Sequence, residues 1–511
     1  TQGEERRKEK DNVFGQGTRT PVSITLLVKH PDETHAGRVH YHDVGDYLTR
    51  EEKLNLVRDF AQSGKADWAD ITPDRHGDWL NQRDDSWYEF APTALGRPNK
   101  PPFGVFQASS TGMVTSRDAW VINYSRETVL QNVSVLAAFY NSQIKKFVDK
   151  GLVPEKGQLE TDPTKISWSR ALRRRAERGL RIEFDENNMR RVSYRPFSEQ
   201  WLYFDSAVIE VSSQMAVLFP NSQANNLVIA VTGGNSPSAL ISSALVDFHY
   251  VGDSQCLPLY WYETSGKSGG LFDDDRGAYR RRDAITDEAL AIFREVYPHA
   301  FIGRYKKDGG IELNKEDIFY YVYGILHSPE YRKRFESNLQ KELPRIPLAE
   351  DFAAFSRAGR RLAYLHLNYE TVEPWASITE CCEANAPGRT VKMRFGKCKK
   401  TEDNPKGVDR TVLHVTDAMT LRGIPEEAYG YVVNGRSAIE WLMDRYQVRT
   451  DKASGIVNDP NEYSDDPRYI VELVERVVTV SMETLEIVNM LPSLSEQQQP
   501  ENWPVAWKAA K

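Results

Sequence analysis

Two short strings of this sequence hold residue types that perform chemistry in other proteins. Residues 265–268 (SGKS) match the end of a phosphate-binding loop, but the required first glycine is replaced by Trp261 and no helix is predicted to follow. Residues 252–256 (GDSQC) follow a predicted strand, as the loop around a nucleophilic serine does. However, Cys256 replaces the last glycine of that loop, and no helix begins there. We therefore interpret both strings as loops without catalytic function.

Several residues near the N-terminus have side chains that bind metal ions in other proteins, but their spacing in the sequence does not fit a metal site. Asp32, Glu51 and Lys53 formally fit a nuclease pattern, which requires these side chains around one metal ion on adjacent strands. Glu51 and Lys53 instead lie in the first turn of a predicted helix, where an acidic residue is favoured by the helix dipole. His40 and His42 would share one face of a strand, but a third ligand at metal-site spacing is missing. We expect structural roles for these residues and no metal site.

The strongest chemical signal is the positive charge of residues 165–195. This segment holds ten Lys/Arg and four Asp/Glu, a net charge of +6, so the other 480 residues carry −13 of the total of −7. Nine of the ten cations are arginine, whose planar fork suits phosphates and guanine edges. Trp168, Tyr194 and Trp201 are interleaved with them. A solvated helix face would give the same count, so the residues alone leave both explanations open.

The candidate contacts with DNA are the cations of this segment and of a second cluster, which begins at Arg276 in a predicted loop. They are Lys165, Arg170, Arg173, Arg174, Arg175, Arg178, Arg190, Arg191, Arg195, Arg280 and Arg281. Arg170, Arg174 and Arg178 recur at intervals of four on one helix face. We expect most of these side chains to contact phosphates, with one or two arginines reaching guanine.

Helices, strands and one loop are predicted to position these cations. We predict helices near 126–149 and over 167–179, the second closed by Gly179, and short strands between 181 and 262. A flexible loop is predicted over 263–283. Further helices are expected at 284–297, 315–327, 329–342, 347–366 and 467–490.

The N-terminal part has the pattern of the end of an α/β domain. Residues 21–30 form an apolar, β-branched run that predicts a strand covered on both faces. Residues 38–48 alternate as a second strand, which we expect to pair with the first as a hairpin. Thr49 and Glu52 then form a capping box at the start of a helix. Residues 64–112 predict a connector with little regular structure.

Composition restricts the class of protein and its compartment. The 511 residues are 40% hydrophobic and 27% charged, which is typical of a globular protein of roughly three domain-equivalents and excludes a disordered or collagen-like chain. Four cysteines in a chain of this size are most simply reduced thiols. No run approaches the length of a membrane span, and the charged N-terminus lacks the apolar region of a signal peptide. We expect a cytoplasmic protein without membrane contact.

Long stretches of the chain resemble one enzyme family. The strings FGQGTRTPVSITLLVKHP (14–31), TSRDAWVINYS (115–125), FDENNMRRVSYRPF (184–197), KEDIFYYVYGILHSPEYRKRF (315–335) and GIPEEAYGYVVNGRSAIEWLMDRYQV (423–448) are similar to type ISP restriction–modification enzymes. In that family one chain combines a nuclease, a translocase, an adenine methyltransferase and a DNA target-recognition domain. The resemblance covers nearly the whole chain.

The resemblance implies a mixed α+β architecture in which the terminal strands of a Rossmann-like methyltransferase sheet precede a β-containing target-recognition region with a helical C-terminal part. It divides the chain into the distal end of the methyltransferase domain (1–63), a connector and helical spacer (64–160), a recognition core (161–345) and a helical or mixed C-terminal part (346–511). A start at Thr1 agrees with a piece of a longer polypeptide.

The resemblance also implies a function and its cofactors. The chain would recognise a specific duplex DNA sequence for upstream methyltransferase and translocase domains of the same polypeptide. The family's glycine-rich loop for S-adenosylmethionine, its NPPY tetrapeptide and its translocase and nuclease motifs are missing from this sequence. We therefore expect S-adenosylmethionine, ATP and Mg²⁺ to bind the parent enzyme and not this chain alone. The alternative is a chain that is itself a competent adenine methyltransferase or nuclease.

Overall fold

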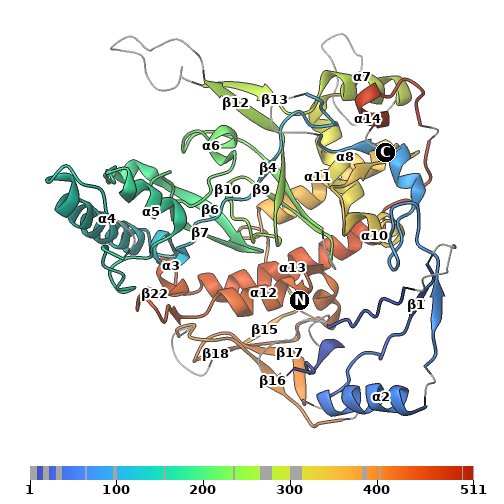
Figure 1. The fold of residues 1–511 in the computed structure, drawn as a ribbon, viewed down its shortest axis with the longest axis horizontal. Coiled ribbons are helices and arrows are strands. Elements are labelled where there is room, and N and C mark those ends of the chain that lie inside the picture. Colours follow the sequence, from blue (N-terminus) through green and yellow to red (C-terminus); the bar gives the residue numbers. More distant parts are fainter. Residues whose placement is uncertain are drawn as a thin grey trace.

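The computed structural model describes residues 8–14, 22–29, 37–63, 66–95, 101–154, 157–233, 236–264, 279–299, 313–382, 388–401, 404, 406–497 and 499–509. Within these ranges the chain is an α+β protein, as predicted, with several small sheets and a helical C-terminal half (Figure 1). None of the helices described is both long enough and apolar enough to cross a bilayer.

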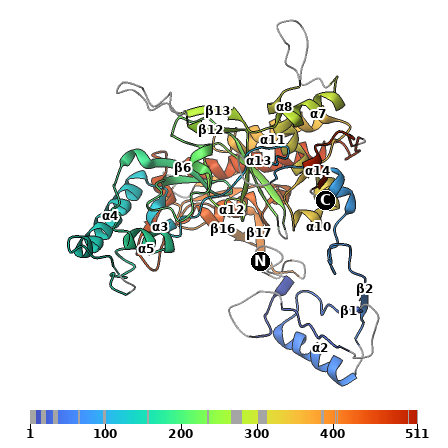
Figure 2. The same ribbon diagram turned by 45° about the horizontal axis from the view of Figure 1, so that its top comes forward.

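The N-terminal segment extends away from the rest of the molecule (Figure 2). It contains β1 (Val39–Tyr41), α2 (Arg50–Ser63) and β2 (Ala69–Ile71), and β1 pairs antiparallel with β2. The predicted capping box is confirmed, because Thr49 N donates to Glu52 Oε2 at 2.6 Å and Glu52 N donates to Thr49 Oγ1 at 3.3 Å.

The predicted strand over 21–30 and its hairpin with 38–48 are wrong for the residues described. Residues 22–29 form no strand, and Leu26, Leu27 and Val28 are 84–94% exposed. The second strand is limited to β1, whose partner is β2. The apolar pattern predicts a strand that is covered on both faces. Among the described residues, however, no strand pairs with residues 22–29, so their backbone forms no sheet hydrogen bonds there.

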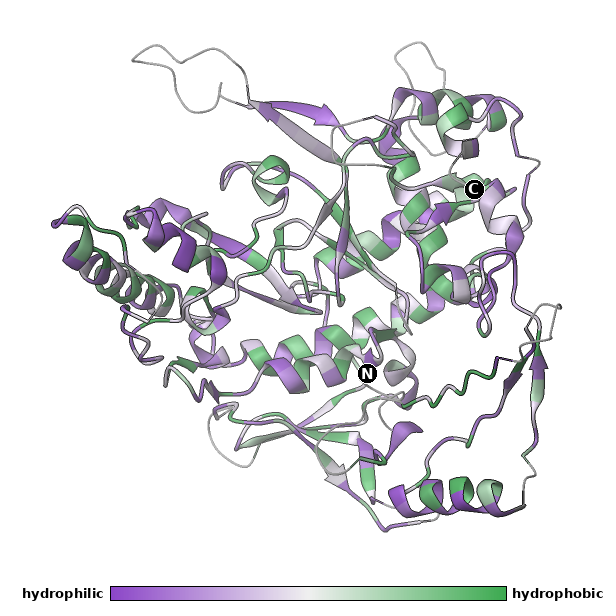
Figure 3. Ribbon diagram, in the orientation of Figure 1, coloured by the Kyte–Doolittle hydropathy of each residue, from purple (hydrophilic) through white to green (hydrophobic). Residues whose placement is uncertain are grey.

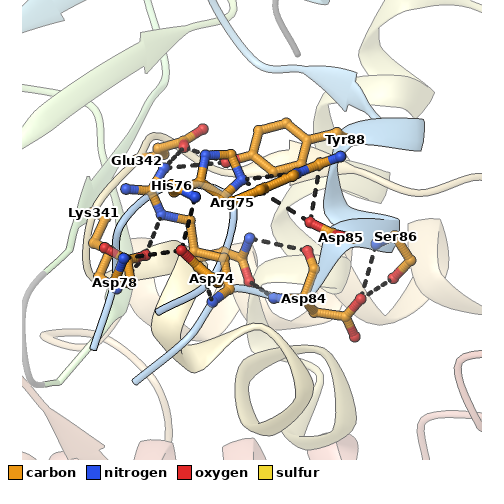
Figure 4. A network of polar contacts seen from close by, with 12 residues as sticks. Asp74, Arg75, His76, Asp78, Asp84, Asp85, Ser86, Tyr88, Lys341 and Glu342 are labelled. Atoms are coloured by element: carbon orange, nitrogen blue, oxygen red, sulfur yellow. Dashed lines mark hydrogen bonds and ion pairs between the residues drawn. The ribbon is translucent and has the colours of Figure 1, made fainter. Parts of the chain in front are cut away.

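The connector contains little regular structure, as predicted, but it is tightly packed. It holds the 3-10 helix η1 (Asp85–Glu89), β3 (Ala91–Pro92) and β4 (Ser110–Thr111), and β3 pairs with β14 (Arg345–Ile346). Ion pairs join it to the helical half, including Arg83 with Glu342 at 2.7 Å and Asp78 with Lys341 at 2.8 Å (Figure 4). The side chain of Trp87 is fully buried. Residues 74–92 are therefore anchored to the helical half of the molecule.

Two four-stranded sheets form the middle of the molecule. One has the order β10-β6-β7-β5 and the other β4-β11-β8-β9. The strands are β5 (Ile122–Asn123), β6 (Met189–Arg195), β7 (Ser198–Tyr203), β8 (Val228–Thr232), β9 (Ser238–Ser242), β10 (Leu245–Val246) and β11 (Gln255–Pro258). The helices beside them are α3 (Asp118–Val121), α4 (Arg126–Val148), α5 (Arg170–Glu177) and α6 (Met215–Leu218). The predicted helices near 126–149 and 167–179 are confirmed as α4 and α5.

A hairpin replaces part of the predicted loop over 263–283. β12 (Tyr260–Thr264) pairs antiparallel with β13 (Tyr279–Asp283). Arg280 and Arg281 therefore lie on a strand and not in a loop, because the arginine-rich run continues the ladder with Tyr262 and Glu263. Arg276 and the string 265–268 lie outside the described residues.

The C-terminal half is built around packed helices. They are α7 (Asp287–Val296), α8 (Lys315–His327), α9 (Pro329–Arg334), α10 (Glu336–Leu339), α11 (Phe352–Leu367), α12 (Ala438–Arg445), α13 (Tyr469–Asn489) and α14 (Val505–Ala509). The single helix predicted over 329–342 is divided at Phe335 into α9 and α10. Helices α8 and α11 pack so closely that a Cβ on Gly359 would lie 1.9 Å from the Tyr320 carbonyl oxygen.

A further four-stranded antiparallel sheet lies beside the C-terminal helices, in the order β15-β18-β17-β16 (Figure 1). Its strands are β15 (Thr379–Cys382), β16 (Arg394–Lys397), β17 (Val408–His414) and β18 (Met419–Arg422). Two short antiparallel pairs complete the fold: β19 (Val432–Val433) with β20 (Arg436–Ser437), and β21 (Arg449–Thr450) with β22 (Val457–Asn458).

Candidate DNA-binding surface

Helix α5 presents arginines because its capping and burial fix which side faces solvent. Ser169 caps its N-terminus by accepting from Leu172 N at 3.3 Å, and Gly179 ends it with φ of +65°. Leu172 and Ala176 are buried against the core, at 1% and 0% exposure. Apart from Ala171, the remaining positions are charged, and Figure 3 shows the helix as strongly hydrophilic.

Arg174 and Arg178 are the most available cations of this surface. Both are exposed, and no carboxylate within the described part of the chain forms an ion pair with either. Arg170 is also accessible, since its side chain is 73% exposed and its Nε lies 3.8 Å from Glu210 Oε1. These three arginines are the ones that the sequence placed on one helix face.

Lys165 and Arg173 have weak contacts that leave their charges near the surface. Lys165 Nζ lies 3.5 Å from Asp162 Oδ2, and its side chain is 50% exposed. The Arg173 guanidinium lies 5.4 Å from the centre of the Trp168 ring. A loose pair and a cation–π contact of this kind contribute little to stability, so both side chains are available to another anion.

Four other predicted cations are used within the fold. Arg175 Nη2 donates to the Arg181 carbonyl at 2.7 Å, and Arg190 Nη2 donates to the Pro220 carbonyl at 3.1 Å. Burial lowers the pKa of Arg190. The contacts of Arg191 and Arg195 are more extensive and involve rings and carboxylates.

Arg191 lies between two aromatic rings. Its guanidinium is 4.3 Å from the centre of the Trp201 ring and 4.6 Å from that of Tyr463, and its Nε lies 3.3 Å from Glu199 Oε1. Burial raises the pKa of Glu199 to about 7, although Arg191 acts in the opposite direction. Arg191 thus connects strand β6 to a tyrosine of the C-terminal half.

The β12–β13 hairpin carries the second group of predicted cations. Arg280 and Arg281 are exposed, and the Arg281 guanidinium lies 4.2 Å from the centre of the Tyr260 ring. The predicted cations therefore form two exposed groups, one on and before α5 and one on the hairpin.

A pocket of about 460 Å³ opens beside the start of α5. Its lining includes Thr115, Asp118, Ser167, Asp247 and Ser454. Asp118 accepts from the Tyr194 hydroxyl at 2.9 Å. Burial raises the pKa of Asp247 to about 7, with Arg195 opposing and Asp118 adding to the shift. A pocket with two carboxylates and several hydroxyls suits a hydrogen-bond donor such as the amino group of a base.

Arg117 holds the wall of this pocket to the start of α5. Its side chain donates to the Ser167 carbonyl at 3.2 Å, to the Val208 carbonyl and to the Ser169 hydroxyl that caps α5. Burial lowers the pKa of Arg117 to about 10. This pocket is not predictable from the sequence, because Thr115, Asp247 and Ser454 are far apart in the chain and none belongs to a charge cluster. TSRD (115–118), within one of the strings that resemble the enzyme family, was the only local signal.

The described residues near the N-terminus that have catalytic or metal-binding side chains make other contacts. Lys53 Nζ binds Glu9 Oε1 at 2.8 Å, and Asp32 lies outside the described residues. His40 Nδ1 lies 2.5 Å from Asp70 Oδ1, and His42 Nδ1 lies 2.8 Å from the Asp67 carbonyl oxygen. Among the residues described, no group of three or more metal-ligating side chains is found.

Comparison with known proteins identifies the family. A family model for the type ISP C-terminal specificity domain matches residues 104–473. The structure of a nuclease-deletion mutant of the type ISP restriction–modification enzyme LlaGI in complex with a DNA substrate mimic is similar, with a TM-score of 0.81 and 37% identity over 97% of this chain and 36% of that chain.

Two other DNA-bound structures are similar. For the ATP-dependent type ISP enzyme LlaBIII bound to DNA, the TM-score is 0.78 with 34% identity, over 92% of this chain and 28% of that chain. For the DrdV–DNA complex, the TM-score is 0.77 with 28% identity, over 97% of this chain and 47% of that chain. No curated protein matches. The chain spans about a third of the length of the LlaGI and LlaBIII chains, and it belongs to the family of type ISP C-terminal specificity domains.

Proposed function

We propose that this chain is the DNA target-recognition module of a type ISP restriction–modification enzyme, which reads a duplex sequence and positions an adenine methyltransferase on it. The observation that carries the proposal is the exposed pair Arg174, on α5, and Arg178, at its C-terminal end, which have no carboxylate partner in the described chain. A pocket with base-reading chemistry opens beside the start of the same helix. Cations of this kind neutralise phosphates, whereas groups that reach base edges provide specificity.

The predicted cations divide into two roles in this proposal. The partly buried Arg173 and six exposed cations contact DNA directly; the six are Lys165, Arg170, Arg174, Arg178, Arg280 and Arg281. The others, which bind carbonyls, rings or carboxylates of the fold, are positioning residues: Arg175, Arg190, Arg191 and Arg195. Asp118 and Asp247 accept hydrogen bonds from an amino group on a base edge.

The rest of the enzyme lies outside this module in the proposal. Residues 1–63 contribute the distal end of the methyltransferase sheet, and upstream domains of the same polypeptide methylate adenine, translocate and cleave. S-adenosylmethionine, ATP and Mg²⁺ bind those domains, in agreement with the lack of the corresponding motifs in this sequence. We place the protein in the cytoplasm, where its four free cysteines stay reduced.

Selection from a random pool of duplexes of about 30 base pairs tests this function. We expect the 511-residue chain to enrich one sequence motif over the input pool, and a variant with D118N to enrich a degenerate motif at one position. A folded chain that binds duplexes but enriches no motif would overturn the proposal. Saturable, stoichiometric binding of S-adenosylmethionine by this chain would instead favour the alternative of an independent methyltransferase.

A further inference from the structure

A second basic surface lies on the sheet β15-β18-β17-β16, far along the chain from α5. We call this sheet, together with residues 398–401, 404 and 406–407 of the loop between β16 and β17, the lysine-rich sheet. Residues 389–410 hold eight Lys/Arg and three Asp/Glu, a net charge of +5. Seven cations on or next to the sheet are exposed: Lys392, Arg394, Lys397, Lys399, Lys400, Lys406 and Arg422.

These seven charges are not neutralised by the described part of the protein. Among the described residues of this region, two cations form ion pairs: Arg389 binds Asp459, and Arg410 Nη2 lies 3.6 Å from Glu440 Oε1. For the seven exposed cations, the described residues provide no carboxylate within ion-pair distance. The surface therefore has a positive charge that an external polyanion would neutralise.

Protection of a sheet edge explains only part of this charge. Charged residues on an edge strand prevent pairing with other chains, and β16 is an edge strand. That role accounts for Arg394 and Lys397. It does not account for Arg422, which lies on the inner strand β18, or for the lysines of the loop.

The loop that carries three of the lysines has a well-defined base. Cys398 N donates to the Gly407 carbonyl at 2.9 Å, and Asn404 exchanges hydrogen bonds of 2.8 and 3.1 Å with the backbone of Val408. Gly407 has φ of +60°, and a Cβ there would lie 2.5 Å from the Cys398 carbonyl oxygen. The base of the loop is thus fixed on the sheet, which reduces the entropy lost when its lysines bind a ligand.

The lysine-rich sheet is joined to the segment that lines the pocket beside α5. Val448 N donates to the Val391 carbonyl at 3.0 Å, and Asn461 Nδ2 donates to the Thr390 carbonyl at 2.9 Å. Between these two attachment points, Asp451, Ala453 and Ser454 line the pocket. The recognition pocket and the lysine-rich sheet are therefore attached to one continuous segment, 448–461, rather than to separate domains.

The two basic surfaces differ in the kind of cation they present. Residues 165–195 have nine arginines among ten cations, whereas residues 389–410 have five lysines among eight. The ammonium group is a point charge on a flexible stem and binds phosphate without the directional fork of arginine. A lysine surface suits a regular array of phosphates more than the edge of one base.

We propose that the lysine-rich sheet binds the phosphate backbone of duplex DNA outside the recognised sequence, through Lys392, Lys397, Lys399, Lys400 and Lys406. The inference rests on the proposed function, because that function supplies the duplex. The lysine-rich sheet would increase the affinity for DNA without sequence preference, in addition to the contacts made at α5. Each phosphate neutralised makes the slope of log K against log salt more negative by about 0.9.

The double variant K399Q/K400Q tests the inference in the full chain, with a random-sequence duplex as probe and KCl varied. We expect the slope to become less negative by about 1.8 and affinity near 100 mM KCl to fall roughly sixtyfold, relative to a 1 M salt reference at which the affinity is unchanged. The matched control K333Q/R361Q removes the same charge from exposed positions on α9 and α11 and should keep the wild-type slope. A K399Q/K400Q slope equal to that of the control would overturn the inference.

A second measurement needs no variant. Acetylation of exposed lysines in the wild-type chain should be slower at Lys399 and Lys400 when the duplex is bound, and unchanged at Lys333. Equal protection of Lys333, Lys399 and Lys400 from acetylation would contradict the inference. It would also be contradicted if K399Q/K400Q lost affinity for single-stranded RNA of the same length but not for the duplex. The proposed function is tested separately, by the enrichment of a sequence motif. If the lysine-rich sheet did not bind DNA, the chain should still enrich that motif.

Discussion

The Arg195 guanidinium donates to the buried carboxylate of Asp247, with Nη1 2.7 Å from Oδ1. Arg195 ends strand β6, and Asp247 follows strand β10, which runs parallel to β6. The two side chains are only 13% and 4% exposed. Because Asp247 also lines the pocket beside α5, this ion pair connects the central sheet to the candidate recognition site.

Removing either member of this pair should destabilise the protein. We expect R195M to lower the free energy of unfolding by about 3 kcal/mol, because it leaves the buried Asp247 carboxylate without its cationic partner. In R195M/D247N this unpaired carboxylate is gone, so the double variant should lose less than the sum of the two single variants R195M and D247N. Urea denaturation measures these values. Additive losses would show that the two side chains act independently.

Arg174 and Arg178 should affect DNA binding but not stability. The variant R174Q/R178Q should make the slope of log K against log salt less negative by about 1.8, because two phosphate contacts are lost. The free energy of unfolding should change by less than about 0.5 kcal/mol, since both side chains are exposed. Fluorescence anisotropy with a labelled duplex, compared with K333Q/R361Q, checks this. An unchanged slope would exclude α5 from the DNA interface.

The helices near the site were predictable because their signals are local. Helix α5 has a serine cap, two buried apolar positions and a terminal glycine within 11 residues, and the structure uses all of them. Helix α13 lies within the range 467–490 that apolar spacing predicts, and its residues Ile470, Val474 and Ile487 are buried. Such signals come from residues that are close together in the chain, so they are recognised without knowledge of the tertiary contacts.

Other features depend on partners that the local sequence does not identify. Residues 22–29 have the composition of a buried strand, but burial requires a neighbouring strand that the pattern cannot specify. A count of arginines likewise does not separate Arg174, which is exposed, from Arg195, which pairs with an aspartate 52 positions away. The pocket combines residues between 113 and 454, so no single stretch of sequence predicts it.

Arg191 should act on stability rather than on DNA affinity. In R191M the protein loses two cation–π contacts and the ion pair with Glu199. The folded-state pKa of Glu199, already about 7, should rise further, so its ionisation becomes more costly. R191M should therefore lose more stability at about pH 8 than at about pH 6, whereas its salt slope with a random duplex stays at the wild-type value. A changed slope of log K against log salt would show that Arg191 contacts DNA directly.

Glu475 on α13 should make stability depend on pH. Glu475 is 6% exposed. Burial and the nearby Glu380 carboxylate raise the pKa of Glu475 from 4.5 to about 7. Between these two pH values the folded state holds a proton that the unfolded state has released. The contribution of Glu475 to the free energy of unfolding therefore decreases as pH rises from about 4.5 to about 7, and stays low above that.

The variant E475Q should remove this dependence, because the amide is neutral at every pH. We expect E475Q to be more stable than wild type by about 2 kcal/mol near pH 8, and equal to it near pH 5. E472Q is the matched control on the same helix: Glu472 lies 2.7 Å from Arg476 Nη2, so its loss should destabilise slightly at both pH values. Urea denaturation at the two pH values measures both variants. If E475Q were no more stable than wild type near pH 8, the Glu475 carboxylate would be stabilised in the fold by Arg468, and its ionisation would carry no cost.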